Sequence, residues 1–171
     1  MFSSPPSSDP LTQGDLFEDC PLIGFDLTAR PLDLNDPPTR WWTSRAIVLT
    51  QSCDLVRGKS DSVLVAQVHV AQKLVERGVL KGATIRDQIR RHQVFGWYFL
   101  PEATAPASLA ESLIDLRDIH SVPRAVLEQL IAEGKRVASL MSPYREHLAQ
   151  HFAVTYMRVA LPEPYDTKPS G

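Results

Sequence analysis

Arg45-Ala46-Ile47-Val48-Leu49-Thr50-Gln51-Ser52 is the stretch that decides the fold, together with Ser62-Val63-Leu64-Val65-Ala66-Gln67-Val68-His69-Val70. The first stretch is a continuous apolar run with β-branched residues, which is typical of a strand buried on both faces. A short turn at residues 57–60 joins it to the second stretch. Because so short a connection suits antiparallel neighbours, the two stretches predict a central antiparallel pair.

Further strands and helices are predicted on the C-terminal side of this pair. Residues 94–100 form an aromatic run, and residues 112–122 alternate apolar and polar side chains, as a half-exposed strand does. The expected helices are 71–77, 84–92 with Thr84 as its N-cap, 123–131, and a closing amphipathic helix that begins at Ser142 and Pro143 and ends at Pro162. Strands dominate the middle while helices form an insertion and the end, so the pattern predicts an α+β fold.

The chain is expected to form one domain flanked by disordered tails. Its 171 residues, 43% hydrophobic and 22% charged, are typical of a single globular domain. Residues 1–12 and 163–171 are polar and contain several prolines, so they bury too little apolar surface to become ordered. The domain therefore spans residues 13–162, with a helical insertion at 71–93. Three prolines predict a long irregular loop within residues 26–44.

A net charge of −2 and two cysteines limit the classes of function. This charge argues against a strong overall attraction to nucleic acid but permits a local basic patch. No apolar run reaches the ~20 residues of a membrane span, and no apolar leader follows Met1, so we expect a cytoplasmic protein without a membrane partner. In a reducing compartment Cys20 and Cys53 are expected to remain free thiols.

Several segments follow the element order of a known family. Gly14-Asp15-Leu16-Phe17 looks like its opening strand, Arg45-Ala46-Ile47-Val48-Leu49-Thr50 like its arginine strand, and residues 113–122 like its late strand. Residues 135–140, followed by Ser142 and Pro143, are similar to its run into the closing helix. In the order of these elements along the sequence, the chain resembles the PemK/MazF-like ribonuclease toxins and, more distantly, the CcdB toxins.

The resemblance implies a small antiparallel SH3-like β-barrel, often a homodimer, with a protein partner such as an antitoxin. In this family an arginine and a threonine promote attack of the RNA 2′-hydroxyl on the adjacent phosphate, without metal. Arg45 matches the arginine. The threonine has no match in Ala66-Gln67-Val68-His69, where His69 is the side chain whose ordinary pKa suits acid–base chemistry.

Polar residues crowd the end of the buried strand in Thr50-Gln51-Ser52-Cys53-Asp54, a string that resembles uncharacterised bacterial proteins. Polar groups at a strand end are typical of a functional site. In one interpretation Cys53 is a nucleophile and Asp54 orients a partner such as His69 or His120. In the other, Asp54 makes local backbone bonds in a turn and Cys53 packs as a small hydrophobe.

The insertion holds the one locally basic stretch. Together with the loop before the central strand, it supplies the candidate nucleic-acid-binding residues, which are Arg40, Trp41, Trp42, Gln51, Arg86, Arg90 and Arg91. The cations would contact phosphates while the tryptophans stack on bases. The alternative is a solvated helical face with the tryptophans covering the core. Cys20, Cys53, His69 and His120 are isolated in the sequence, and His147 and His151 have the i, i+4 spacing but lack the glutamate of the His-Glu-x-x-His zinc signature, so we expect no metal or other cofactor.

Three functions are compatible with these patterns. The first is binding of RNA or single-stranded nucleic acid, with cleavage by a metal-independent endoribonuclease whose catalytic candidates are Arg45, Cys53, Asp54 and His69. The second is a non-catalytic protein-interaction subunit of a bacterial defence or regulatory assembly. The third is a cysteine-dependent enzyme built on Cys53.

Overall fold

The computed structural model describes residues 1–26, 28, 35–56, 59–106 and 108–157. Within these residues the strands are β1 Phe2–Ser3, β2 Asp15–Phe25, β3 Thr39–Val48, β4 Ser62–Val70, β5 Trp97–Leu100, β6 Ser112–Pro123 and β7 Arg136–Leu140. The helices are α1 Ala71–Glu76, α2 Gly82–Asp87, α3 Arg124–Ala132 and α4 Tyr144–Tyr156, with a 3₁₀ turn at Ile89–Arg91. None of the helices in this part of the chain is both long and apolar enough to cross a membrane.

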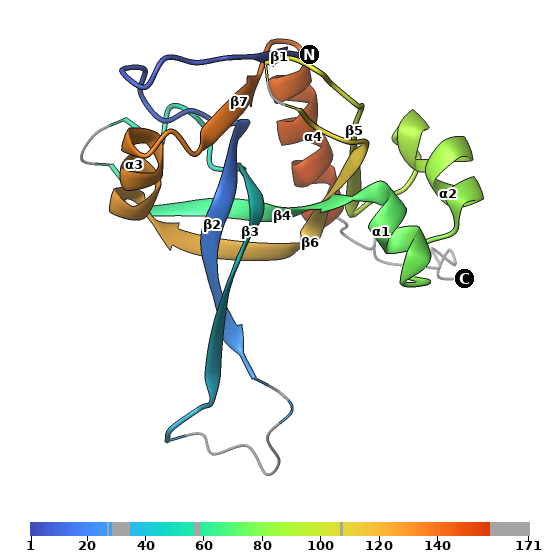
Figure 1. Ribbon diagram of the computed structural model, residues 1–171, viewed down its shortest axis with the longest axis horizontal. Coiled ribbons are helices and arrows are strands. Elements are labelled where there is room, and N and C mark those ends of the chain that lie inside the picture. Colours follow the sequence, from blue (N-terminus) through green and yellow to red (C-terminus); the bar gives the residue numbers. More distant parts are fainter. Residues whose placement is uncertain (27, 29–34, 57–58, 107, 158–171) are drawn as a thin grey trace, which may run out of the picture.

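The described strands form one antiparallel sheet in the order β1-β7-β2-β3-β4-β6-β5. The α+β class and the antiparallel pairing of β3 with β4 are therefore confirmed. The order has two ends, β1 and β5, so the pairing does not show a closed barrel. The sheet is strongly bent, because β2 and β3 run across the direction of β4 and β6 (Figure 1). Register shifts in β2 and β4 accompany this bend.

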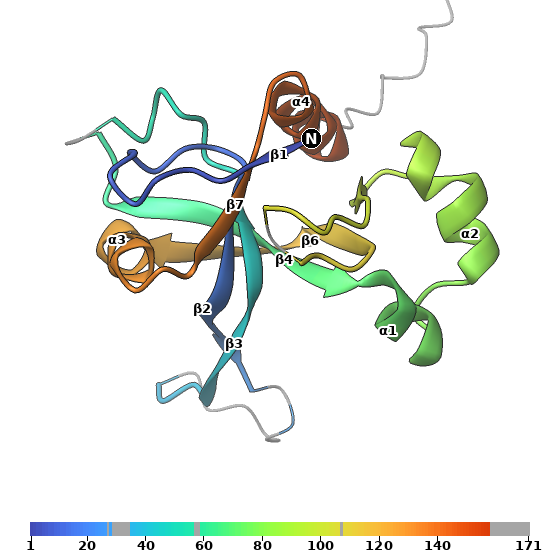
Figure 2. The same cartoon turned by 45° about the horizontal axis from the view of Figure 1, so that its top comes forward.

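The core packs on both faces of the central strands. Val65 belongs to a cluster that contains Leu127 of α3, whereas its neighbour Ala66 belongs to a cluster that contains Leu148 of α4. The two helices lie on different sides of β7 in both ribbon views (Figure 2). Because successive side chains of a strand point to opposite faces, a strand covered on both sides must be apolar throughout. This explains the continuous apolar run from which the central strand was predicted.

The prediction of an irregular loop within residues 26–44 is wrong for the last part of that range. β3 begins at Thr39, and residues 39–43 pair with β2, for example Trp41 with Ile23. The side chains at 41 and 42 are tryptophans, which favour a strand once a partner strand is present. Residues 27 and 29–34 of the predicted loop lie outside the described residues, as do residues 57–58 of the predicted turn.

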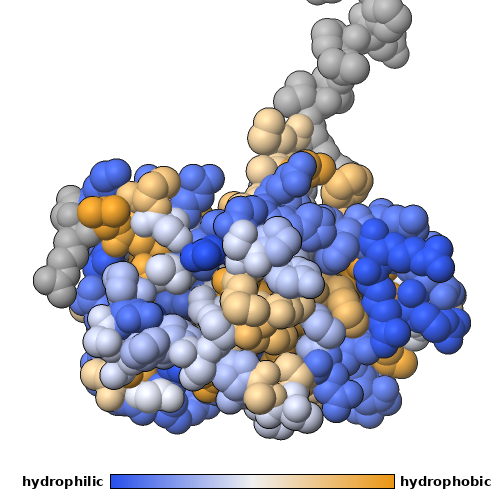
Figure 3. Space-filling model, turned by 90° about the horizontal axis from the view of Figure 1, so that it is seen from above, coloured by the Kyte–Doolittle hydropathy of each residue, from blue (hydrophilic) through white to orange (hydrophobic). Residues whose placement is uncertain are grey.

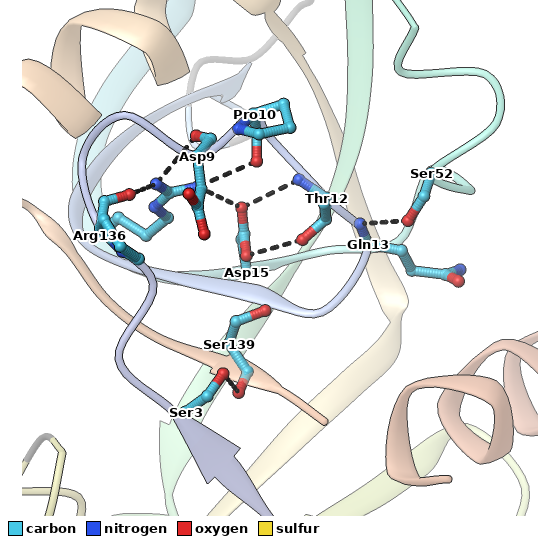
Figure 4. A network of polar contacts seen from close by, with 10 residues as sticks. Ser3, Asp9, Pro10, Thr12, Gln13, Asp15, Ser52, Arg136 and Ser139 are labelled. Carbon is cyan, nitrogen blue, oxygen red and sulfur yellow. Dashed lines mark hydrogen bonds and ion pairs between the residues drawn. The ribbon is translucent and has the colours of Figure 1, made fainter. Parts of the chain in front are cut away.

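The N-terminal segment is not the disordered tail that its composition predicts. β1 pairs with β7, and the Arg136 guanidinium donates to the backbone carbonyls of Pro6, Asp9 and Pro10 (Figure 4). The same guanidinium donates to the carboxylate of Asp15 at 3.1 Å, and both side chains are almost fully buried. A buried cation needs acceptors, and the segment supplies them from its backbone. The predicted tail at residues 163–171 lies outside the described residues.

The helices confirm some boundaries and correct others. The predicted 71–77 and 123–131 helices correspond to α1 and α3. The helix predicted for 84–92 is wrong, because α2 ends at Asp87 and His92 has a left-handed φ of 56°. Ser142 does not cap α4, which begins at Tyr144 without a side-chain cap hydrogen bond. The predicted end at Pro162 lies outside the described residues.

Candidate nucleic-acid cleft between β3 and β4

A cleft opens where β3 and β4 separate. The two strands pair at only three positions, from Val48–Val65 to Ala46–Gln67, and β4 then shifts register against β6. α1 continues directly from the end of β4 (Figure 1). The resulting cavity has a volume of about 430 Å³ and is lined by polar side chains that include Glu18, Arg45, Gln67, His69, Lys73 and Arg77.

Arg45 reaches this cleft from β3 as an ion pair with Glu18 of β2. Arg45 Nε lies 2.7 Å from Glu18 Oε1, and the terminal Nη2 contacts the same oxygen. The Arg45 side chain is 21% exposed and that of Glu18 is 33% exposed. The guanidinium is therefore positioned between protein and solvent, where an incoming anion competes with one carboxylate for it.

His69 lies at the end of β4 on the other wall of the cleft. Desolvation by burial lowers the pKa of His69, and the carboxylates of Asp115 and Asp118 oppose that shift. The lowered pKa keeps the imidazole neutral at neutral pH. A neutral imidazole carries a free nitrogen lone pair, so His69 is suited to accept a proton from a bound hydroxyl group.

Lys73 and Arg77 are cleft residues that sequence reasoning missed. The sequence marked residues 71–93 as basic, but selected other arginines of that stretch for binding. Lys73 lies in α1, and Arg77 directly follows the helix with a helical backbone conformation, so the four-residue spacing places both on one side. Both line the cavity that contains Arg45 and His69. The i, i+4 spacing was the signal that was available. Glu18 had no such signal, because only the pairing of β2 with β3 brings it to Arg45.

The Cys53 turn lies away from the cleft, at the opposite end of the β3–β4 hairpin. The Cys53 thiol is exposed, and its sulfur lies 3.7 Å from Gln51 Oε1 and 3.7 Å from Asp54 Oδ1. Gln51 and Asp54 line a different cavity, of about 350 Å³, beside Phe152 of α4. The structure thus divides the candidate catalytic residues: Arg45 and His69 share one cavity, and the Cys53 turn is separate from it.

The two neighbouring tryptophans have different surroundings. Trp42 is half-buried, with its ring 5.5 Å from that of His120. The Arg40 guanidinium lies over the Trp42 ring at 5.1 Å. Trp41, on the other face of β3, is 74% exposed. Of these candidate binding residues, Trp41 is the ring whose face is available to a ligand.

The three arginines of the insertion lie apart from the cleft. Arg86 pairs with Asp87 at 3.0 Å, and Arg90 pairs with Glu111 while lying 5.2 Å from the Phe99 ring centre. Arg86 and Arg90 line a separate small cavity. The insertion presents a mostly hydrophilic surface on the right of Figure 3. Arg86, Arg90 and the exposed Arg91 do not line the cavity that contains Arg45, whereas Lys73 and Arg77 of the same insertion do.

The described residues contain no group of three or more His, Cys, Asp or Glu side chains arranged to hold a metal ion. No protein-family model matches this chain, and no curated protein matches it. A functional hypothesis therefore has to rest on the residues of the cleft themselves. Their composition is three cations, one carboxylate and one neutral imidazole around a cavity large enough for a nucleotide-sized group.

Proposed function

We propose that this chain binds single-stranded RNA in the β3–β4 cleft and cleaves it as a metal-independent endoribonuclease. The observation that carries the proposal is the shared cavity of Arg45 and His69, with Lys73 and Arg77 beside them. Cations that line a cleft attract a polyanion and orient a phosphate. A neutral histidine next to them supplies the base that a transesterification needs.

The proposed reaction uses only groups of the cleft, the RNA and water. His69 accepts the proton of the RNA 2′-hydroxyl, and the 2′-oxygen attacks the adjacent phosphorus. The bond from phosphorus to the 5′-oxygen breaks, and water protonates the leaving oxygen. Arg45 stabilises the negative charge that develops on the phosphate, in the manner of an oxyanion site. The products are a 2′,3′-cyclic phosphate and a 5′-hydroxyl end.

We further propose that the chain is a divergent PemK/MazF-like protein. The bent antiparallel sheet supports an SH3-like barrel that is not fully closed. The free thiols of Cys20 and Cys53 fit action in the reducing cytoplasm. A homodimer and a protein partner such as an antitoxin are part of the same proposal, and sedimentation of the pure protein at several concentrations tests the first.

Cleavage of a mixed-sequence RNA in the presence of EDTA tests the activity. We expect cleavage by the wild type and a loss of at least about a hundredfold in rate for Arg45→Ala, because one preorganised charge contact contributes about 10²–10³ in rate. His69→Gln tests the base. Arg145→Ala serves as the matched control, since Arg145 is an arginine of α4 that pairs with Glu146 and does not line the cleft.

The products and the binding assay decide between the alternatives. A DNA strand of the same sequence should bind but stay intact, because it has no 2′-hydroxyl. Neither cleavage nor retardation of RNA at low salt would contradict the proposal and would favour the non-catalytic interaction subunit. Equal cleavage by wild type and Arg45→Ala would exclude the cleft as the active centre.

A further inference from the structure

β2 and β3 extend beyond the body of the sheet as a projecting two-stranded arm (Figure 1). β7 pairs with β2 only at residues 15–17, and β4 pairs with β3 only at residues 46–48. Beyond these positions the two strands pair with each other, from Cys20–Ser44 to Phe25–Thr39. Among the described residues, no further strand pairs with the two outer edges of the arm. One face of the arm packs on the core through Cys20, Leu22 and Trp42, and the other face is not covered by the sheet.

One face of the arm is apolar and exposed. Ile23, Phe25 and Trp41 are 70%, 62% and 74% exposed, and Ile23 lies directly opposite Trp41 in the register. Side chains two residues apart on a strand share a face. Phe25 therefore shares the face of Ile23, and Trp41 shares the face of Thr43 and Arg45. We call Ile23, Phe25 and Trp41 the arm face.

We propose that the arm face is a base-stacking platform for single-stranded RNA that continues out of the cleft. This inference rests on the proposed function, because the cleft holds the phosphate that fixes the path of the strand. It adds a binding subsite and a requirement on the substrate: the strand must be unpaired and must extend beyond the cleavage position on one side.

The spacing of the arm face suits nucleotides. Phe25 and Trp41 are diagonal neighbours across the two strands, a relation in which residues lie about 7–8 Å apart. That is roughly twice the ~3.4 Å rise per nucleotide in a stacked strand, so a base fits between two such side chains. Aromatic rings bind every base through its π-face, and each stack is worth about 1–3 kcal/mol.

The position of the arm face relative to the cleft favours RNA over a protein partner. Trp41 lies four residues before Arg45 on the same face of β3, about 13 Å along the strand. At roughly 3.4 Å or more per nucleotide, about two to four nucleotides cover that distance. Thr43, which lies between the two, also lines the cleft. The apolar face thus leads directly to a cavity that holds three cations and one carboxylate, a charge balance complementary to phosphate.

Length-dependent binding of oligonucleotides tests this inference. The probes are fluorescein-labelled strands that carry a 2′-deoxy residue at the cleavage position and between one and six ribonucleotides on either side. We expect Trp41→Leu to weaken the binding of the longest strands about tenfold and to leave the shortest strands unaffected. Trp41→Phe keeps a ring and should restore most of the affinity. Val79→Ala is the control, because Val79 is an exposed apolar residue of the insertion.

Steady-state kinetics provide the second measurement. With long cleavable strands, Trp41→Leu should raise KM and leave kcat within about twofold, because the stacked base is bound equally in the ground state and the transition state. Equal affinity of wild type and Trp41→Leu for the longest strands would overturn the inference, while cleavage that depends on Arg45 would leave the proposed function intact.

The remaining outcomes also separate the two proposals. Failure of the wild-type protein to bind any of the strands would contradict both the proposed function and the stacking platform. A Trp41→Leu variant that loses a dimer in sedimentation but binds RNA normally would assign the arm face to a protein contact and overturn the inference alone. Loss of affinity for short and long strands alike would show that the substitution disturbs the cleft, which also contradicts a separate subsite.

Discussion

At the scale of single residues, the main feature of the cleft is that its central cation already has a partner. Glu18 binds the Arg45 guanidinium through one carboxylate oxygen, in a pair that is partly open to solvent. An RNA phosphate must therefore displace this carboxylate or share the guanidinium with it. Because Arg presents several donors in a planar fork, sharing between two anions is geometrically possible, but the negative charge of Glu18 opposes it.

Glu18→Gln should tighten RNA binding. The amide keeps the size of the side chain and removes the competing negative charge, so we expect about a three- to tenfold lower Kd at low salt. The difference should shrink as salt rises, since charge interactions at partly exposed sites are screened. Gel retardation of an uncleavable strand at several salt concentrations measures this. Glu76→Gln is the control, because Glu76 belongs to α1 but does not line the cleft. Weaker binding by Glu18→Gln would show instead that Glu18 holds Arg45 in its binding position.

At the scale of elements, the sequence predicted those parts whose cause is local. The apolar run of β3, the alternation of β6 and the glycine after α1 each indicated the correct type of element. The sequence did not predict β7 or an ordered N-terminal segment. The two are held together by Arg136, whose guanidinium binds backbone carbonyls about 130 positions earlier in the chain. No local pattern reports such a contact.

The candidate site was predictable to a similar extent. Arg45 was chosen because it matches an arginine of the toxin family that the sequence resembles, and His69 because its ordinary pKa suits acid–base chemistry. The antiparallel pairing of their strands brings the two residues to one cavity. The Cys53 turn was expected beside them because it also ends a buried strand. In an antiparallel hairpin the turn lies at the opposite end from Arg45 and His69, so the two groups are separated by the length of the paired strands.

The buried pair of Arg136 and Asp15 is the contact on which the N-terminal segment depends. Asp15 also accepts hydrogen bonds from the backbone N–H and the hydroxyl of Thr12, each at 3.0 Å (Figure 4). Gln13, the next residue, donates from its side chain to the carbonyl of Leu49 at 2.7 Å. The network therefore connects the segment to the end of β3 as well as to β7.

Arg136→Met should destabilise the fold by about 3–5 kcal/mol, because it leaves the Asp15 carboxylate buried without its counter-ion. Urea unfolding followed by far-UV circular dichroism measures the free energy of unfolding. The matched control is Lys135→Met at the neighbouring position, where the ammonium pairs with the exposed Asp19. An exposed pair contributes little to stability, because solvent and salt screen it. Similar losses in both variants would contradict the role given to the buried pair.

At the scale of the whole molecule, a cluster of three histidines joins parts that are distant in the chain. The His92 ring, at the end of the insertion, lies 4.4 Å from that of His147 and 5.8 Å from that of His151, both on α4. Tyr98 of β5 contacts the same rings, and its hydroxyl lies 3.2 Å from His147 Nδ1. The insertion is therefore held to α4 and to the edge strand β5 by imidazole rings, and the burial of His92 and His151 disfavours the charged form of each.

Acid should weaken this junction between the insertion, β5 and α4. Desolvation, together with the neighbouring His147 and His151, lowers the pKa of His92 to about 4, and desolvation also lowers the pKa of His151. In the unfolded chain both histidines bind a proton near their ordinary pKa of about 6.5. The unfolded state therefore binds more protons than the folded state as the pH falls from about 6.5 towards 4, and the free energy of unfolding decreases over that range.

His92→Asn isolates one histidine of the cluster. Asn tolerates the left-handed backbone of residue 92 and does not titrate. A shift of one pKa unit corresponds to about 1.4 kcal/mol, and because His92 is partly exposed, solvent reduces its contribution to the order of 1 kcal/mol at pH 5. Between pH 7.5 and pH 5.0 the free energy of unfolding should therefore fall less in His92→Asn than in the wild type, by about that amount. Urea unfolding at the two pH values measures the difference, and other buried groups that titrate cancel in the comparison. An equal fall in both proteins would mean that the junction already admits the charged imidazole, and the insertion would then be held by its apolar contacts with β5 and β6 alone.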